Sequence, residues 1–131
     1  MRSTHLASFA LVLVTTLTSA VAVSGCDDGA ACNGGDCQCS GPGCAVDCPQ
    51  GGCDQQCSDG DCDFTCEGGA CDQQCSSGST CTADCAGGNC DQACSPGATC
   101  TFTCSGGGCD QFCGGSPTCS ATCTGPACTT L

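Results

Sequence analysis

Thiols dominate the chemistry that this sequence could perform. The chain has 131 residues, of which 23 are cysteines, and from Cys32 onward short and longer gaps between cysteines alternate. Cysteines at this density could bind soft metals as thiolates, act as a redox pair, or cross-link the chain as disulfides. Redox pairs usually have the spacing C-x-x-C, which does not occur in this sequence. The spacing therefore favours metal thiolates or disulfides.

A metal-thiolate protein is the less favoured of these two interpretations. A zinc or copper buffer that resembles metallothionein would show many C-x-C pairs and lysines. Here Cys37-Gln38-Cys39 is the single C-x-C, and lysine is absent. Export, which the N-terminal residues indicate, also favours oxidised cysteines. We therefore expect a disulfide scaffold and keep a metal-thiolate protein as an alternative.

The remaining polar side chains offer little for catalysis. From Cys26 onward the sequence has no Lys, Arg, His, Tyr or Trp, so carboxylates, hydroxyls and thiols are the only candidate acids, bases and nucleophiles. Paired carboxylates could hydrolyse glycosides, but no Trp or Tyr could stack on a sugar. All 13 acidic residues lie in this part, and their charge repels nucleic acid and anionic lipid. We expect a protein that is not an enzyme, needs no cofactor and does not bind nucleic acid.

The N-terminal segment, residues 1–25, has the composition of an export signal. Arg2 and His5 precede an apolar run over residues 6–14, and small and hydroxyl residues follow as far as Gly25. A membrane-spanning anchor would need about 20 strongly apolar residues, and threonines and a serine interrupt this run. We assign residues 1–25 to a signal peptide. Cleavage after Ala22, in the small-x-small sequence Ala20-Val21-Ala22, is an alternative.

Val23-Ser24-Gly25-Cys26 resembles the lipobox of bacterial lipoproteins. The resemblance implies that Cys26 receives a diacylglycerol thioether, becomes the new N-terminus and anchors the chain in a membrane. Residues 26–31 would then be the lipid attachment and a short tether. Parity gives an independent reason to set Cys26 apart, because without it an even number of cysteines remains and all of them can pair.

Residues 32–131 form a cysteine-rich repeat. From Cys53 the units are CDQQCSDGDCDFTCEGGA, CDQQCSSGSTCTADCAGGN, CDQACSPGATCTFTCSGGG and CDQFCGGSPTCSATCTGPA, so the period is eighteen once and nineteen three times. A shortened first unit is expected over residues 37–52, with Cys37-Gln38-Cys39 in place of the usual Cys-Asp-Gln-x-Cys. A fixed period near 20 indicates stacked units.

Each unit has two C-x-x-x-C segments separated by turn residues such as Gly, Ser, Pro and Asn. If each segment is a short strand, both cysteines and the middle residue face inward. The inward middle residues are then Gln55, Gln73, Gln92 and Gln111 on one side and Val46, Phe64, Ala83, Phe102 and Ala121 on the other. The outward residues include Asp54, Asp72, Asp91, Asp110, Thr65, Thr82, Thr101, Thr103 and Thr122. This pattern predicts an all-β, flattened, two-sided β-solenoid of 18–19-residue coils stacked at roughly 4.8 Å, with a string of small disulfide knots as the alternative.

Disulfides must replace the missing apolar core. Outside Cys and Ala, the apolar residues after the signal are Val46, Phe64, Phe102, Phe112 and Leu131, and each contributes only about 1.5 to 3 kcal/mol on burial. Two cysteines of one C-x-x-x-C strand lie about 13 Å apart, too far for a disulfide. The partner therefore lies across a turn or in a neighbouring coil. Pairing across turns uses every cysteine from Cys32 onward, in the pairs 32–37, 39–44, 48–53, 57–62, 66–71, 75–81, 85–90, 94–100, 104–109, 113–119 and 123–128. Such close crossings would leave little room for Phe64 and Phe102.

Two outward columns suggest ligand-binding alternatives. Stacked aspartates repel one another and could be relieved by calcium, although no calcium-loop motif is present and solvated surface acids are commoner. The threonines at Thr101 and Thr103 resemble the flat arrays of insect antifreeze solenoids, but equivalent positions hold Asp63, Asp84 and Ser120. The sequence thus favours an exported, lipid-anchored cell-envelope protein with a structural or interaction role and a membrane as partner through Cys26. The alternatives are a secreted calcium- or ice-binding repeat protein and a metal-thiolate protein.

Overall fold

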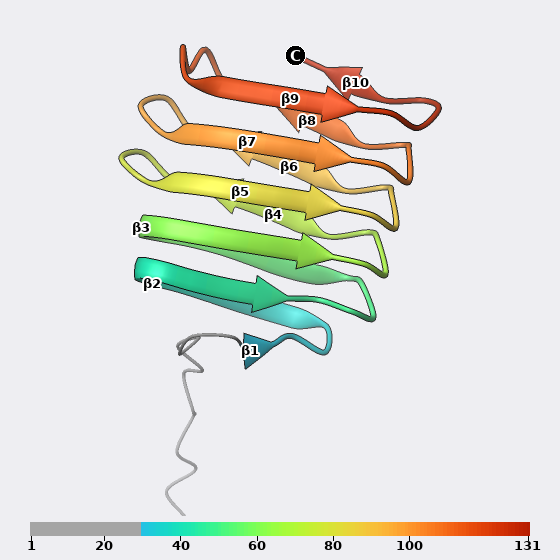
Figure 1. Ribbon diagram of the computed structural model, residues 1–131, viewed down its shortest axis with the longest axis horizontal. Helices are drawn as coiled ribbons and strands as arrows, with labels where there is room; N and C mark the ends of the chain where they lie inside the picture. Colours follow the sequence, from blue (N-terminus) through green and yellow to red (C-terminus); the bar gives the residue numbers. More distant parts are fainter. Residues whose placement is uncertain (1–29) are drawn as a thin grey trace, which may run out of the picture.

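The computed structural model describes residues 30–131, which form a solenoid of parallel strands without a helix in that range (Figure 1). The signal peptide at residues 1–25, the lipidation site Cys26 and all of the tether before Ala30 lie outside the described residues. No helix in the described part is long and apolar enough to cross a membrane. The strands are β1 (Ala30–Ala31), β2 (Gly35–Asp47), β3 (Cys53–Cys66), β4 (Asp72–Cys75), β5 (Thr80–Cys85), β6 (Asp91–Cys94), β7 (Thr99–Cys104), β8 (Asp110–Phe112), β9 (Cys119–Cys123) and β10 (Thr129–Thr130).

The strands form two faces that lie back to back. Residues 35–39 of β2 and 53–57 of β3 make one face together with β4, β6, β8 and β10, which we call the glutamine face. Residues 44–47 of β2 and 61–66 of β3 make the other face together with β1, β5, β7 and β9, which we call the phenylalanine face. Each coil contributes one segment to each face. The predicted two-sided β-solenoid is therefore confirmed.

The pairing register confirms the period but corrects the first unit. Asp54 pairs with Asp72, and Asp72 pairs with Asp91, so successive coils are offset by one repeat of the sequence. Gly35 pairs with Cys53, and Cys37 pairs with Gln55. The first unit therefore starts at Gly35 and is as long as the next one, so the expected shortened unit over residues 37–52 is wrong. Cys37 occupies the position that a buried glutamine has in later coils.

A shorter turn explains this substitution. Ala31 pairs with Asp47, so Cys32 corresponds to Cys48 of the next coil. Cys48 and its partner Cys53 have a sequence separation of 5, whereas the strand position equivalent to Cys53 is Gly35, which follows Cys32 more closely. A cysteine at that position would close a tighter turn. Cys37 instead bonds to Cys32 from further along the strand, with a Cα–Cα distance of 6.6 Å.

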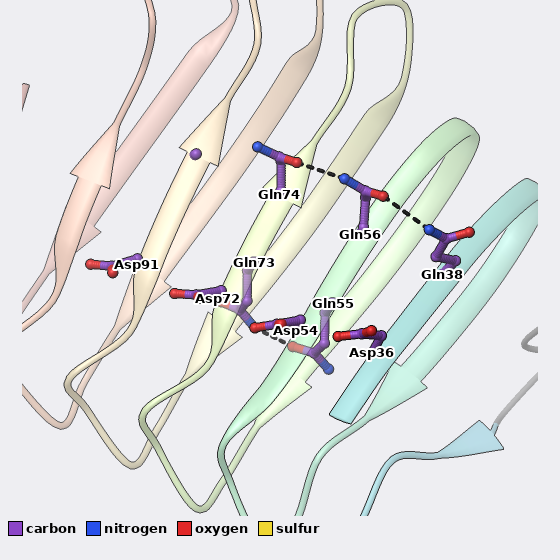
Figure 2. A pocket seen from close by; sticks show the side chains of 10 residues that line it. Asp36, Gln38, Asp54, Gln55, Gln56, Asp72, Gln73, Gln74 and Asp91 are labelled. Carbon is purple, nitrogen blue, oxygen red and sulfur yellow. Dashed lines mark hydrogen bonds between the residues drawn. The ribbon is translucent and has the colours of Figure 1, made fainter. Parts of the chain in front are cut away.

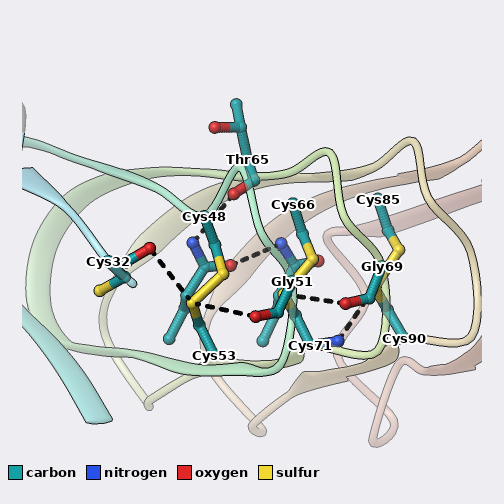
Figure 3. The surroundings of a disulfide bond; sticks show 12 residues. Cys32, Cys48, Gly51, Cys53, Thr65, Cys66, Gly69, Cys71, Cys85 and Cys90 are labelled. Atoms are coloured by element: carbon teal, nitrogen blue, oxygen red, sulfur yellow. Dashed lines mark hydrogen bonds between the residues drawn. A yellow bond between two sulfur atoms is a disulfide. The ribbon is translucent and has the colours of Figure 1, made fainter. Parts of the chain in front are cut away.

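Every described cysteine forms a disulfide across a turn. The eleven disulfides join cysteines with a sequence separation of 5 or 6 and Cα–Cα distances between 5.5 and 6.6 Å, and they match the pairing across turns at each position. Figure 3 shows three of them, Cys48–Cys53, Cys66–Cys71 and Cys85–Cys90, in successive coils. The bonds lie where the chain crosses from one face to the other. The middle of each coil is therefore left for other side chains, and Phe64 and Phe102 fit there with 1% of their surface exposed.

A ladder of buried glutamines fills the glutamine-face half of this interior. Gln55, Gln73, Gln92 and Gln111 are almost completely buried. The Nε2 atoms of Gln73, Gln92 and Gln111 each donate to the Oε1 of the glutamine one coil before, at 2.8 to 2.9 Å. The same amides also donate to backbone carbonyls of the phenylalanine face, as Gln92 does to Ala83 at 3.0 Å. The ladder thus connects successive coils and also connects the two faces. These hydrogen bonds satisfy amide groups whose burial without partners would lower the free energy of unfolding.

The ladder ends where Cys37 replaces a glutamine. Gln55 has no glutamine oxygen before it, and its Nε2 donates to the backbone carbonyls of Val46 and Thr65 at 3.0 and 3.1 Å. On the opposite side of the interior, Phe64 pairs in register with Ala83 and Ala83 with Phe102. Large and small side chains therefore alternate along the axis, as expected from the sequence, and fill the space beside the ladder.

Two stacked turns show why the Gly-Gly sequences recur. Gly69 and Gly88 both have φ of 78°, a left-handed conformation that side chains disfavour. A Cβ atom on Gly69 would lie 2.6 Å from the carbonyl oxygen of Gly88 in the next coil. Glycine at these positions lets the turns stack as closely as the strands do.

We expect full reduction of the disulfides to unfold the solenoid. Each ring of about six residues contributes roughly 2 kcal/mol on the loop-entropy model, and the apolar side chains are too few to compensate. A strong reductant without denaturant should abolish the far-ultraviolet circular dichroism signal of the strands, and oxidised protein in denaturant should show no free thiol from Cys32 onward. A reduced protein with an unchanged spectrum and melting temperature would contradict this.

We expect Gln73→Met to lower the free energy of unfolding by about 2 kcal/mol or more. The substitution keeps the side-chain length but leaves the Oε1 of Gln55 buried without its donor and removes an acceptor from Gln92. The measurement is denaturant-induced unfolding of the oxidised protein. Gln74→Met is the matched control, because Gln74 is exposed on the same strand, and it should change stability by less than about 0.5 kcal/mol. Equal effects of both substitutions would show that the buried ladder does not stabilise the fold.

Candidate functional site: the acidic column of the glutamine face

The outer surface of the glutamine face carries a column of aspartates. Strand pairing sets Asp36, Asp54, Asp72, Asp91 and Asp110 beside one another in successive coils. Adjacent parallel strands lie about 4.8 Å apart, so the carboxylates repeat at close to that distance. Figure 2 shows the first four in a row with their carboxyl groups oriented the same way, and all four are exposed. The outward aspartate column predicted from the sequence is therefore present, and it begins one unit earlier, at Asp36.

A second column of polar side chains runs parallel to the aspartates. The Nε2 of Gln38 donates to the Oε1 of Gln56 at 3.3 Å, and the Nε2 of Gln56 donates to the Oε1 of Gln74 at 2.7 Å (Figure 2). The aspartate and glutamine columns border a shallow groove of about 510 Å³. This outer glutamine ladder was not predicted, although the repeated Cys-Asp-Gln-Gln-Cys of two units is the signal that could have revealed it.

The column raises the pKa of its central member. Although Asp72 is exposed, partial burial among its neighbours disfavours the charged form of its carboxyl, and the charges of Asp54 and Asp91 act in the same direction on its pKa. Hydrogen bonds with those two carboxyls raise the pKa further. No Lys, Arg or His lies within residues 30–131 to offset this repulsion. The column is thus a site of concentrated negative charge.

The outer surface of the phenylalanine face mixes acidic and hydroxyl side chains. One column contains Asp63, Thr82, Thr101 and Ser120, and the other contains Asp47, Thr65, Asp84, Thr103 and Thr122. Thr65 donates a hydrogen bond through its Oγ1 to the Oδ1 of Asp47 in the coil before. The interruptions expected from the sequence are therefore present in both columns. A flat, continuous threonine array of the kind that ice binding uses is not formed over residues 30–131.

Sulfur atoms from neighbouring coils also approach one another. Cys48, Cys66 and Cys71 place their Sγ atoms within 4.8 Å, a separation that could suit a metal ion. Cys66 and Cys71 are joined to each other, and Cys48 is joined to Cys53. A metal centre needs thiolates, and sulfurs paired in disulfides do not supply them. The sulfur clusters therefore belong to the scaffold.

We expect Asp72→Asn to change how stability depends on pH. A carboxyl with a higher pKa in the folded chain binds its proton more tightly when folded, so this group raises the free energy of unfolding as pH falls toward its ordinary value of 3.8. Wild type should therefore gain melting temperature, relative to Asp72→Asn, between about pH 7 and about pH 4, and the variant should be the more stable of the two near neutral pH.

Asp63→Asn is the matched control for this pH experiment. Asp63 lies between Ala45 and Thr82 in register, so it has no acidic neighbour in its column. A change in the pH profile that both variants share would therefore not come from the aspartate column. Identical profiles for wild type and Asp72→Asn would contradict the electrostatic interpretation of the column.

Comparisons with protein-family models, with curated proteins and with solved structures found no match to this chain. The disulfide pattern, the two faces and the charge of the chain are therefore the features on which a functional proposal can rest.

Proposed function

We propose that the protein is an exported, lipid-anchored component of a bacterial cell envelope, with a structural or interaction role. One observation carries the proposal. The eleven disulfides use every cysteine from Cys32 onward, so they leave no partner in the described part of the chain for Cys26. Cys26 is also the residue at which the sequence resembles a lipobox. A lipid thioether gives that residue a role which the disulfide scaffold does not.

The disulfides themselves support export. Cysteines in the cytosol are kept reduced, whereas exported proteins form and retain disulfides. The chain depends on these bonds because Val46, Phe64 and Phe102 are its only fully buried large apolar side chains among the described residues. A scaffold of this kind suits an oxidising compartment outside the cytosol.

A structural or interaction role follows from the shape and the side chains. Each coil lengthens the solenoid by about 4.8 Å and is fastened by disulfides at its turns, so the described residues form a rigid body with two broad faces. The polar side chains of residues 30–131 are carboxylates, hydroxyls and amides, without the His, Lys or Tyr that most acid–base mechanisms use. The solenoid is better suited to presenting a surface than to catalysis.

Cation binding along the aspartate column is a second candidate, favoured by the carboxylates that strand pairing sets side by side in successive coils. Calcium prefers oxygen ligands, and the column supplies carboxylates at a regular spacing. No other feature of residues 30–131 points to an ion at this position, so lipid anchoring remains the function we propose.

The anchor is tested by metabolic labelling with a radioactive fatty acid in a bacterial host. Wild type should incorporate the label and partition into the detergent phase, and Cys26→Ala should lose both properties because the thiol that would carry the lipid is gone. Asp28→Asn is the matched control, since it changes a nearby residue and leaves the thiol in place. Equal labelling of wild type and Cys26→Ala would refute the anchor.

A further inference from the structure

The disulfides along one edge of the solenoid lie against one another, and Figure 3 shows three of them in successive coils. We call this edge the glycine edge, and its disulfides are Cys48–Cys53, Cys66–Cys71, Cys85–Cys90, Cys104–Cys109 and Cys123–Cys128. In each bond before the last, the first sulfur lies within 4.8 Å of both sulfurs in the next coil, as that of Cys66 does with those of Cys85 and Cys90. The sulfur atoms of this edge therefore form one continuous column.

Glycines in the turns of this edge explain the close approach. Gly69 and Gly88 are buried in successive turns, so they bring no side chain into the space beside the disulfides. The turns also bond to one another through their backbones, since the N–H of Ala70 donates to the carbonyl oxygen of Gly88 at 2.9 Å. The cysteines on either side of these turns are thus held at the spacing of the strands.

The turns of the opposite edge do have buried side chains, which belong to Ser79, Ala98 and Ser116. The Oγ of Ser79, for example, lies 3.0 Å from the Sγ of Cys75. Within residues 30–131 this edge has one sulfur cluster, around the turn of residues 58–61, and the disulfide Cys94–Cys100 belongs to none. The two edges therefore differ in the contacts between their sulfurs, although both are closed by disulfides.

Strand pairing places the cysteines of the glycine edge where a disulfide between coils would fit. Cys66 pairs in register with Cys85, and Cys85 pairs with Cys104. Adjacent parallel strands lie about 4.8 Å apart, and a disulfide needs a Cα–Cα distance of about 4.4 to 6.8 Å. Cys66 is therefore positioned to bond either across its turn, to Cys71, or to Cys85 in the next coil.

A hydrogen bond between coils favours one of the sulfurs as a leaving group. The backbone N–H of Cys71 donates to the Sγ of Cys90 at 3.4 Å in the buried interior (Figure 3). A donor at this position stabilises negative charge on the sulfur, and a more stable thiolate leaves faster in thiol–disulfide exchange. The contact therefore favours attack on Cys85 with departure of Cys90.

We propose that the disulfides of the glycine edge form an exchange column, in which an unpaired thiol in one coil displaces a sulfur of the disulfide in the next coil. When Cys66 lacks its partner, its thiolate attacks the Sγ of Cys85. The Cys66–Cys85 bond forms and the Cys85–Cys90 bond breaks. Cys90 leaves as a thiolate, which takes up the proton that Cys66 lost. The numbers of disulfides and thiols stay the same, so the step needs neither an oxidant nor a reductant.

The exchange changes what a disulfide connects. A bond across a turn joins the two faces, whereas a Cys66–Cys85 bond joins β3 to β5 on the phenylalanine face. The solenoid consequently stays cross-linked next to a cysteine that has lost its partner, and the unpaired thiol passes to the neighbouring coil. This activity depends on the stacked disulfides and holds whether or not Cys26 carries a lipid.

The full-length Cys71→Ser variant tests the proposal, because it leaves Cys66 unpaired and keeps the backbone N–H of residue 71. After incubation at about pH 8, where part of a free thiol is ionised, the protein is acidified, unfolded and labelled with a maleimide. Pepsin cleaves in acid and needs no Lys or Arg, so its peptides show by mass spectrometry which cysteine carries the label. We expect label on Cys90 and a peptide pair joined by Cys66–Cys85.

The same variant shows whether the isomers exchange in the folded protein. The isomer with a Cys66–Cys85 bond is separated by chromatography in acid, where exchange stops. On return to about pH 8 it should regain the isomer in which Cys66 is free, at a rate that dilution does not change. Below neutral pH the rate should fall about tenfold per pH unit, as the thiolate fraction does. An isomer that does not convert, or a rate independent of pH, would overturn the proposal.

Cys94→Ser is the matched control. It leaves Cys100 unpaired on the same face, and Cys100, like Cys66, is 1% exposed and has a cysteine beside it in register in each neighbouring coil. Because Cys100 lies outside the sulfur clusters, its label should stay in place. Equal migration from Cys100 and from Cys66 would show that strand register alone permits exchange, and the proposed role of the column would be wrong.

Cys90→Ser repeats the test one coil further along the column and decides the matter if Cys71→Ser does not fold. It leaves Cys85 unpaired within 4.8 Å of the sulfurs of Cys104 and Cys109. Part of the label should again move to a cysteine of a neighbouring coil. Label confined to Cys66 in folded Cys71→Ser, or to Cys85 in folded Cys90→Ser, would overturn the proposal. Cys26 is present in every variant and in wild type, so it does not affect these comparisons.

Discussion

The disulfide across each turn is the constraint on which the rest of the molecule depends. It holds the two faces about 6 Å apart, between Cα atoms, at both edges of every coil. The interior is consequently narrow, and it admits one glutamine from one side and one apolar side chain from the other. A conventional core would need sheets about 10 Å apart and many more large apolar residues. Covalent crossings let residues 30–131, which have three fully buried large apolar side chains, keep one defined shape.

The glutamine ladder helps to fix the register between stacked coils, which the disulfides do not determine. A disulfide joins two strand segments that follow each other directly along the chain and lie on opposite faces, so it does not by itself fix the register between strands stacked on one face. The amides of Gln73 and Gln92 do so, because each bonds to the equivalent side chain of the previous coil and to the opposite face. Backbone pairing along the strands acts in the same direction. Disulfides therefore stabilise the turns of each coil, and glutamine hydrogen bonds stabilise its interior. Each set of bonds helps the other to exclude water from the polar interior.

Most of the fold could be predicted because the cysteine spacing leaves few alternatives. The two cysteines of a C-x-x-x-C segment cannot bond within a strand, so the gaps identify the turns and the pairing follows. The start of the first unit could not be predicted in this way, because Cys37 resembles a strand-end cysteine in spacing and only strand pairing shows that it lies beside Gln55. The outer glutamine ladder and the raised pKa of Asp72 likewise arise from contacts between successive units of the repeat. Such contacts become visible only when the coils are stacked.

The turns accept different lengths without disturbing the strands, which bears on how the repeat could evolve. The unit that begins at Cys53 and the longer one that begins at Cys71 differ at one turn, where the disulfide-bonded cysteines have a sequence separation of 5 for Cys57–Cys62 and 6 for Cys75–Cys81. The strands on both sides keep their alignment. Duplication or loss of one unit would therefore change the length of the solenoid in steps of about 4.8 Å while its first and last coils stay the same. The length of the solenoid is thus set by the number of units.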